Sequence, residues 1–185
     1  IAMRCWHPRA SETIKKVKKF NPNEIILLPL YPQYSVATSG SSLLEWKDLA
    51  NKNNLNINTK TICCYPEDKK FIKAHSKLII EKIINLKNFK LIFSAHGLPE
   101  KNIKKGDPYQ WQIEQSVKSI MNEINDANID YILSYQSRVG PLKWIGPSTE
   151  EVIVKNSKLN KNLVIVPIAF VSEHSETLVE LDIEY

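Results

Sequence analysis

Short apolar runs alternate with helical patterns along the whole chain, and this alternation constrains the fold more than any other feature. Five runs rich in Ile and Val predict strands, at residues 24–30, 59–64, 90–94, 130–134 and 163–170. None alternates cleanly between apolar and polar residues, so each strand is expected to be buried on both faces. Helical patterns separate the runs, which predicts an α/β fold with mostly parallel strands and right-handed crossovers.

Helical patterns occupy the intervals, at residues 10–20, 42–51, 67–86, 107–124, 149–156 and 173–185. The most polar stretch, NKNNLNIN at residues 51–58, predicts a loop between two lobes, with residues 1–58 in the first lobe and 59–185 in the second. The start resembles the tail of a strand, and Tyr185 ends a helical pattern with no cap after it. We therefore expect this chain to be the middle of a longer protein.

The amino-acid composition argues against some classes of function. Of 185 residues, 43% are hydrophobic and 24% charged, which is ordinary for a soluble globular protein. The 25 basic residues include only 3 Arg, whereas nucleic-acid readers depend on Arg, so nucleic-acid binding is not expected. The densest basic run, residues 15–19 (KKVKK), predicts a solvated helix face; weak attraction to an anionic membrane surface is the alternative.

Neither a membrane span nor an export signal is recognisable. No apolar run reaches the roughly 18 residues that a span needs. The three cysteines, Cys5, Cys63 and Cys64, contain no Cys-x-x-Cys spacing, which favours inert thiols in a reducing compartment. We expect a cytoplasmic protein, with peripheral contact at the inner membrane as an open alternative.

Chemically suggestive side chains follow four of the predicted strands. They occur at residues 31–35, at His96, at residues 135–138 (including Arg138), and at Glu173, His174 and Glu176. Ligands of open parallel sheets bind beyond the carboxyl ends of the strands, so these loops are expected to converge on one site. Arg138 could bind an anionic substrate group or a local carboxylate.

His96 is the strongest single candidate. It lies between Ala95 and Gly97, whose small side chains leave space around an imidazole. An unperturbed pKa of ~6.5 suits proton exchange near neutral pH, and neutral imidazole binds Fe, Zn and Cu. The alternative is a histidine that hydrogen-bonds to backbone at a strand end.

Three glutamates share one stripe of the last predicted helix. Glu176, Glu180 and Glu184 are spaced by four, and residues 163–185 contain neither Lys nor Arg. Such an unneutralised row suggests a path for a cation, the alternative being a solvated acidic face. Trp144 lies in PLKWIGP, a loop stiffened by proline, where it either covers the core or forms a wall for a flat ligand.

Several collinear motifs resemble the ferrochelatase family. They are MRCWHP at 3–8, LYPQYS at 30–35, TSGSSL at 38–43, FSAHGLP at 93–99, GDPY at 106–109, YQSRVGP at 135–141, WIGP at 144–147 and PIAFVSEHSETL at 167–178. The resemblance implies two Rossmann-like, chelatase-type lobes, the first only partly present, and insertion of ferrous iron into a porphyrin.

The resemblance also implies roles for individual residues. His96 and Glu176 match the active-site pair, and Glu180 and Glu184 the acidic metal path behind it. Four residues match the porphyrin-binding side: Arg4, Tyr31, Tyr34 and Trp144. Cys5 stands where the family usually has Tyr, and Ser175 where it usually has an aliphatic residue. The expected ligands are porphyrin and ferrous iron, with no further cofactor; iron–sulfur cysteines of some members would lie beyond Tyr185.

Two alternatives accompany this reading. The chain could be a fragment that binds metal or porphyrin without turnover, because the family's first half-lobe would precede Ile1. It could also be a related chelatase that inserts another metal into another tetrapyrrole.

Overall fold

The computed structural model describes residues 1–137, 140–173 and 175–184, with the backbone alone for Glu176 and Glu184. It divides into two compact units, Ile1–Cys64 and Tyr65–Tyr185. The boundary lies later than the one that the sequence predicted after residue 58. The reason is that β2 (Asn58–Thr61) pairs with β1 (Glu24–Leu27), which keeps this strand in the first unit.

The first unit packs helices against a two-stranded parallel sheet. Its helices are α1 (Ala10–Phe20), a short π-helix η1 (Val36–Gly40) and α2 (Ser41–Lys52). Ala10 and Ile14 of α1, Ile25 of β1 and Trp46 of α2 form one buried cluster. The helix expected at residues 10–20 is therefore confirmed, and Ala10, Ile14 and Val17 pack in the core cluster, whereas Phe20 at its end is exposed.

The strands of this unit are not buried on both faces, as the sequence had predicted. All four residues of β2 are exposed, and in β1 Ile25 is buried whereas the next residue, Ile26, is 60% exposed. The prediction was wrong here because α1 and α2 cover only the face that carries Ile25. Leu28 lies 54% exposed just after β1.

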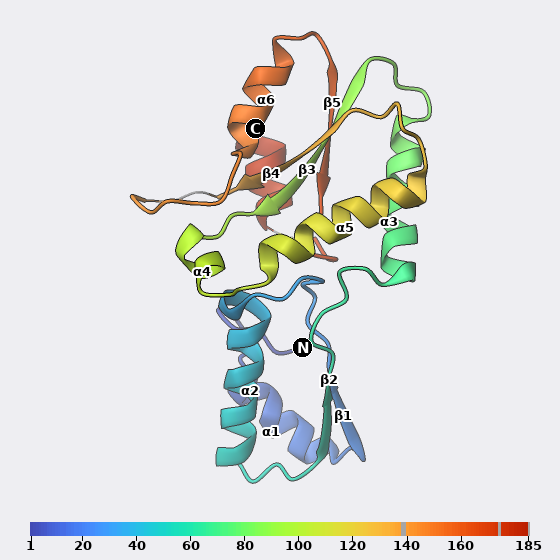
Figure 1. Ribbon diagram of the computed structural model, residues 1–185. Helices are drawn as coiled ribbons and strands as arrows, with labels where there is room; N and C mark the ends of the chain where they lie inside the picture. Colours follow the sequence, from blue (N-terminus) through green and yellow to red (C-terminus); the bar gives the residue numbers. More distant parts are fainter. Residues whose placement is uncertain (138–139, 174, 185) are drawn as a thin grey trace. The chain divides into compact units, whose positions relative to one another are not determined.

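The second unit is built on three parallel strands in the order β4-β3-β5. These are β3 (Phe89–His96), β4 (Tyr131–Gln136) and β5 (Asn162–Pro167). The helices are α3 (Lys69–Ile83), α4 (Glu100–Lys104), α5 (Tyr109–Ile124), α6 (Thr149–Ser157) and the π-helix η2 (Glu176–Glu184). Because each connection between paired strands carries a helix, the predicted α/β class with parallel strands is confirmed (Figure 1).

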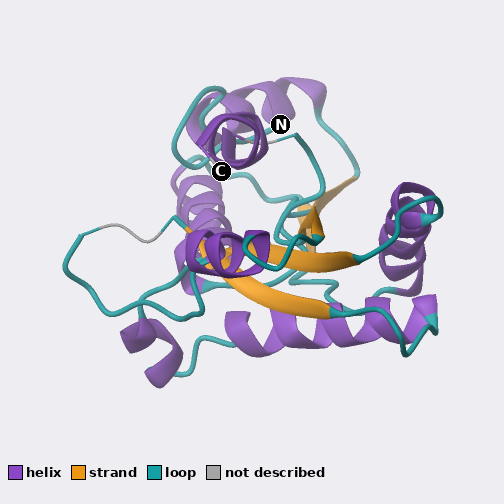
Figure 2. Ribbon diagram, turned by 90° about the horizontal axis from the view of Figure 1, so that it is seen from above, coloured by secondary structure: helices purple, strands orange, loops and turns teal. Residues whose placement is uncertain are grey.

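Helices lie on both sides of this sheet (Figure 2). In the central strand Leu91, Ile92 and Phe93 are fully buried, so residues pointing to either face are covered, as the sequence predicted. Ile113 and Ile120 of α5 are also fully buried. Within the described residues, no helix has both the length and the apolar character needed to cross a membrane.

Candidate active site at the carboxyl ends of the strands

His96 is the last residue of β3, at the carboxyl edge of the sheet, and is half-buried. Its backbone is anchored on two sides. Tyr109 at the start of α5 donates its hydroxyl to the His96 carbonyl at 3.0 Å, and the Gly97 amide donates to the Gln136 carbonyl at 2.8 Å. The structure therefore places His96 where ligands of parallel sheets bind, as the sequence predicted.

A buried cluster of polar side chains lies beneath this edge. The Ser94 hydroxyl donates to Gln136 Oε1 at 2.6 Å and lies 3.1 Å from Thr149 Oγ1, which is 2.9 Å from the Ser134 hydroxyl. Ser94 and His96 lie two residues apart on β3, so their side chains leave the same face of the sheet. Sequence reasoning missed this cluster. The signal was that the runs KLIFS and DYILS each end in a serine, and Ser94 and Ser134 are register partners.

The Trp144 loop runs beside the segment that follows His96. The Glu100 amide donates to the Lys143 carbonyl at 2.8 Å, and the Ile145 amide donates to the Leu98 carbonyl at 3.0 Å. Ile145 is buried, whereas Trp144 remains half-exposed. Ile145 fills the core at this point, and a wall role for the Trp144 indole stays a prediction.

Ion pairs reinforce the contact between these two loops. Glu100 lies 3.1 Å from Lys104 Nζ and 3.2 Å from Lys143 Nζ. Hydrogen bonds from Lys104, and then from Lys143, lower the pKa of the Glu100 carboxyl. The carboxylate therefore stays ionised and connects α4 to the Trp144 loop.

The acidic segment after β5 forms a π-helix, whereas the sequence predicted an α-helix. Hydrogen bonds in a π-helix span five residues, so its turns are wider; a spacing of four still comes close to one full turn. Glu176, Glu180 and Glu184 therefore keep backbone positions along one side of η2. The side chains of Glu176 and Glu184 lie outside the described structure, as do His174 and Arg138.

Among the side chains of this helix that the structure describes, Glu180 contacts the edge of the sheet. The Ser137 hydroxyl, one residue after β4, donates to Glu180 Oε2 at 2.5 Å. His96 and Gln136 are register partners at the ends of neighbouring strands. The ends of β3 and β4 are therefore adjacent, and Ser137 contacts η2, while the convergence of His174 and Glu176 on His96 stays a prediction.

The remaining substrate-binding candidates lie in the first unit. Arg4 lies 3.5 Å from Glu45, with an exposed side chain. Tyr31 and Tyr34 are half-buried between β1 and η1, and a Cβ on Gly40 would lie 2.5 Å from the Tyr34 hydroxyl. The glycine therefore permits the ring of Tyr34 to pack against η1. That these residues face His96 stays a prediction.

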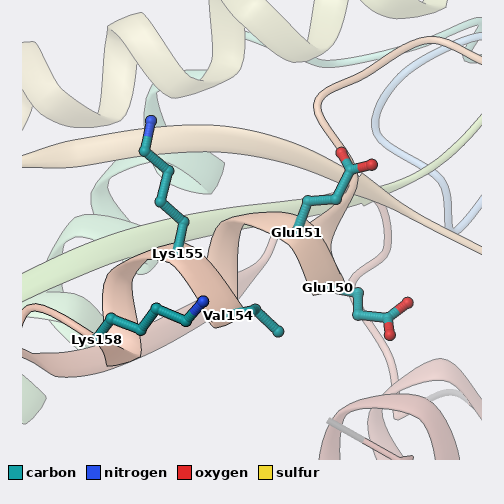
Figure 3. A pocket seen from close by; sticks show the side chains of 5 residues that line it. All are labelled: Glu150, Glu151, Val154, Lys155 and Lys158. Atoms are coloured by element: carbon teal, nitrogen blue, oxygen red, sulfur yellow. The ribbon is translucent and has the colours of Figure 1, made fainter.

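No group of three His, Cys, Asp or Glu residues in the described part of the chain is arranged to hold a metal ion. The described surface has a pocket of about 480 Å³ along α6, lined by Glu150, Glu151, Val154, Lys155 and Lys158 (Figure 3). Glutamates in the first turn and a lysine in the last turn complement the helix dipole, which explains these charges without a ligand.

Comparison with known proteins identifies relatives along the whole chain. A family model described as Ferrochelatase matches residues 1–185. The ferrochelatase of Pelagibacter ubique (strain HTCC1062) is 74% identical over 185 residues, covering all of this chain and 54% of that protein. The ferrochelatase of Rickettsia bellii (strain OSU 85-389) is 56% identical, covering all of this chain and 51% of that protein. The chain thus spans about half the length of these relatives.

A solved structure supports the fold alone. The protein described as SirB from Bacillus subtilis with Fe3+ matches with a TM-score of 0.60 at 14% identity. The match covers 98% of this chain and 66% of that structure. The shared architecture is of the chelatase type.

Proposed function

The chain belongs to the ferrochelatase family, and from that premise we propose that it takes part in inserting ferrous iron into a porphyrin during haem biosynthesis. The observation that carries the proposal is the position of His96, in a family match over all 185 residues, at the carboxyl edge of the parallel sheet. The proposed substrates are ferrous iron and protoporphyrin IX or coproporphyrin, with no further cofactor.

Proton removal is the first chemical requirement. Two pyrrole protons must leave as the metal enters, so a base has to lie beside the macrocycle. We propose that His96 and Glu176 together remove the pyrrole protons and contact the metal, without dividing these two roles between them. The bonds to the His96 carbonyl and to Gln136 hold the strand end in place, which supports a preorganised imidazole.

Delivery of the metal is the second requirement. A hydrated ferrous ion must exchange its water ligands, and carboxylate oxygens can replace them stepwise. We propose that Glu180 and Glu184, behind Glu176, supply such oxygens. A flat apolar macrocycle needs aromatic walls, a role that we propose for Trp144, Tyr31 and Tyr34, with Arg4 facing a porphyrin carboxylate.

The test is metallation under anaerobic conditions. Purified chain is mixed with protoporphyrin and ferrous or zinc ion, and the visible absorption of the free porphyrin is followed, with the Pelagibacter relative as positive control. We expect His96→Ala to abolish nearly all metallation while porphyrin binding is retained. His75→Ala, a histidine that packs against Phe71 on α3, is the matched control and should retain activity. Undiminished turnover in His96→Ala would refute the role of His96.

The same assay separates the second candidate function. Because the chain spans about half the length of its relatives, a fragment that binds metal or porphyrin without turnover is the main alternative. Binding without conversion would support that alternative. Conversion with another divalent metal but not with iron would support a different chelatase.

We further propose that the protein is cytoplasmic and contacts the anionic inner membrane peripherally. Lys15, Lys16, Lys18 and Lys19 are exposed on α1, and Phe20 is 81% exposed at its end. Lysines near an anionic surface attract it, and an exposed aromatic ring can enter the interface. Flotation with vesicles containing phosphatidylglycerol, but not with neutral vesicles, is expected; no flotation with either would refute this contact.

A further inference from the structure

Ser137 has an unusual backbone for a serine. Its φ is 60°, in the left-handed region. The other described non-glycine residues with positive φ are all asparagines, namely Asn21, Asn54, Asn88, Asn125 and Asn160. Asparagine tolerates this region because its side chain bonds locally to the backbone, whereas serine is not enriched there. Such an outlier persists only where the surrounding structure imposes it.

The preceding residues show how the conformation is imposed. Gln136 is 2% exposed, its Oε1 accepts from Ser94, and its carbonyl accepts from the Gly97 amide. On the other side of β4, the Tyr135 amide donates to the Pro147 carbonyl at 2.9 Å. Hydrogen bonds to the Gly97 segment on one side and to Pro147 on the other thus hold the end of β4. They fix the direction in which the chain leaves the strand at Ser137.

This conformation brings the Ser137 hydroxyl to Glu180, which lies 43 residues later in the chain. The hydroxyl donates to Oε2 of the carboxylate, and the contact is part-buried. A hydroxyl fixes one carboxylate oxygen and leaves the negative charge in place, whereas a lysine or arginine would neutralise that charge. Glu180 therefore keeps its attraction for a cation while its side chain is held in one orientation.

We propose that Ser137 is a positioning residue for Glu180: its hydrogen bond to Oε2 orients the carboxylate so that Oε1 is presented to an incoming divalent cation. This inference rests on the proposed function, in which Glu180 belongs to the metal path. Hydrogen-bonded partners of ligating carboxylates commonly change metal affinity by about 10–100-fold when they are removed. The Ser137 backbone strain is then the cost of placing a donor at this point.

The first test measures the affinity of the porphyrin-free protein for Zn²⁺ by titration calorimetry. Ser137→Gly removes the hydroxyl and relieves the backbone, so we expect Zn²⁺ to bind about tenfold more weakly while the melting temperature does not fall. Ser137→Asn keeps a donor and tolerates positive φ, so it should recover affinity. Ser119→Ala removes another serine–glutamate hydrogen bond, to Glu67 at 3.3 Å, and should leave affinity unchanged.

The second test asks whether Ser137 acts through Glu180. In a Glu180→Ala background, Ser137→Gly should have no further effect on Zn²⁺ affinity, because the group that it positions is absent. An equal loss of Zn²⁺ affinity in both backgrounds would overturn the inference. So would an unchanged Zn²⁺ affinity in the Ser137→Gly variant, or the finding that the parent protein binds no Zn²⁺.

Neither test needs porphyrin turnover. A failure of the proposed function can therefore be distinguished from a failure of the positioning role of Ser137. Ser137-dependent Zn²⁺ binding in a protein that never metallates porphyrin would refute the proposed function and leave the positioning role standing.

Discussion

At the residue scale, hydroxyl groups beneath the candidate site hold two strands and a helix together. Thr149 is fully buried at the first position of α6, and its Oγ1 contacts the hydroxyls of both Ser94 and Ser134. Buried polar groups are tolerated because they are paired, and in this cluster Ser94 also donates to Gln136 Oε1 and Ser134 to the Phe93 carbonyl. Tyr135 is the contrasting case: it is 1% exposed, and its hydroxyl has no hydrogen-bond partner among the described residues.

This contrast predicts opposite outcomes for two substitutions that each remove a buried hydroxyl. Thr149→Val preserves shape but removes a hydrogen-bond partner that Ser94 and Ser134 share, and these keep only Gln136 Oε1 and the Phe93 carbonyl. We expect it to lower the free energy of unfolding by about 1 kcal/mol. Tyr135→Phe removes a hydroxyl that has no hydrogen-bond partner among the described residues, so stability should stay equal or rise. Urea unfolding of the two variants and the parent measures both effects. Equal stability of Thr149→Val and the parent would contradict the contribution of the cluster.

Burial also governs the ionisation of Tyr135. Desolvation, with a smaller contribution from the charge of Glu114, raises its pKa well above the usual range for tyrosine. The phenol is therefore neutral near neutral pH.

At the element scale, one carboxylate connects the amino ends of the three strands in the second unit. Asp130, just before β4, lies 3.0 Å from Lys90 Nζ on β3 and 2.8 Å from Lys161 Nζ just before β5. Hydrogen bonds from Lys161, and then from Lys90, lower the pKa of Asp130. The contact therefore connects the starts of all three strands through one carboxylate.

The lowered pKa predicts how the stability contributed by Asp130 depends on pH. A carboxyl whose pKa is lower in the folded state contributes stability above its unfolded pKa, near 3.9, and loses that contribution as the pH falls through the folded value. The side chain is 42% exposed, so solvent screening limits the contribution. Asp130→Asn should lower the free energy of unfolding by about 0.5–1 kcal/mol at pH 7.

Unfolding titrations of parent and Asp130→Asn at pH 7 and near pH 2.5 measure this dependence. The difference between the two proteins should shrink toward the acidic pH, because the carboxyl loses its charge as the pH falls through its lowered folded pKa. A difference that stays constant across this range would show that the charge of Asp130 contributes nothing.

At the scale of the whole molecule, apolar burial is distributed unequally between the two units. In the described part of Ile1–Cys64, the buried hydrophobic side chains are Ala10, Ile14, Ile25 and Trp46. The second unit buries both faces of β3 together with residues of α3, α5 and α6. Because apolar burial is the main driving force for folding, the units should differ in stability against local opening.

Hydrogen exchange resolved by peptides is the measurement that checks this difference. Amides of β1 and β2 should exchange fastest among the strands, and those of β3 slowest. Equal protection of β2 and β3 would show that the first unit is stabilised by more than its core cluster. A Trp46→Ala variant should accelerate exchange in α1 and β1 while leaving β3 unchanged, because Trp46 belongs to the core cluster of the first unit.

Much of the fold could be predicted because its causes are local in sequence. The α1 helix matches its expected bounds, and the central strand is buried on both faces as expected. The burial of β1 and β2 could not be predicted, because it depends on how many layers cover a strand. His96 and Trp144 could be singled out, because a strand end and a proline-stiffened loop are visible in sequence.

The sequence by itself determined the order of the elements, their parallel pairing and the edge at which His96 lies, because hydrophobic periodicity records the faces that each segment must bury. Only the tertiary structure decided the partners of the polar groups. The contact between Ser94 and Thr149 spans 55 residues and that between Ser137 and Glu180 spans 43. Such pairs produce no periodic pattern in the sequence, because a hydrogen bond between distant segments forms only where the fold brings the two segments together.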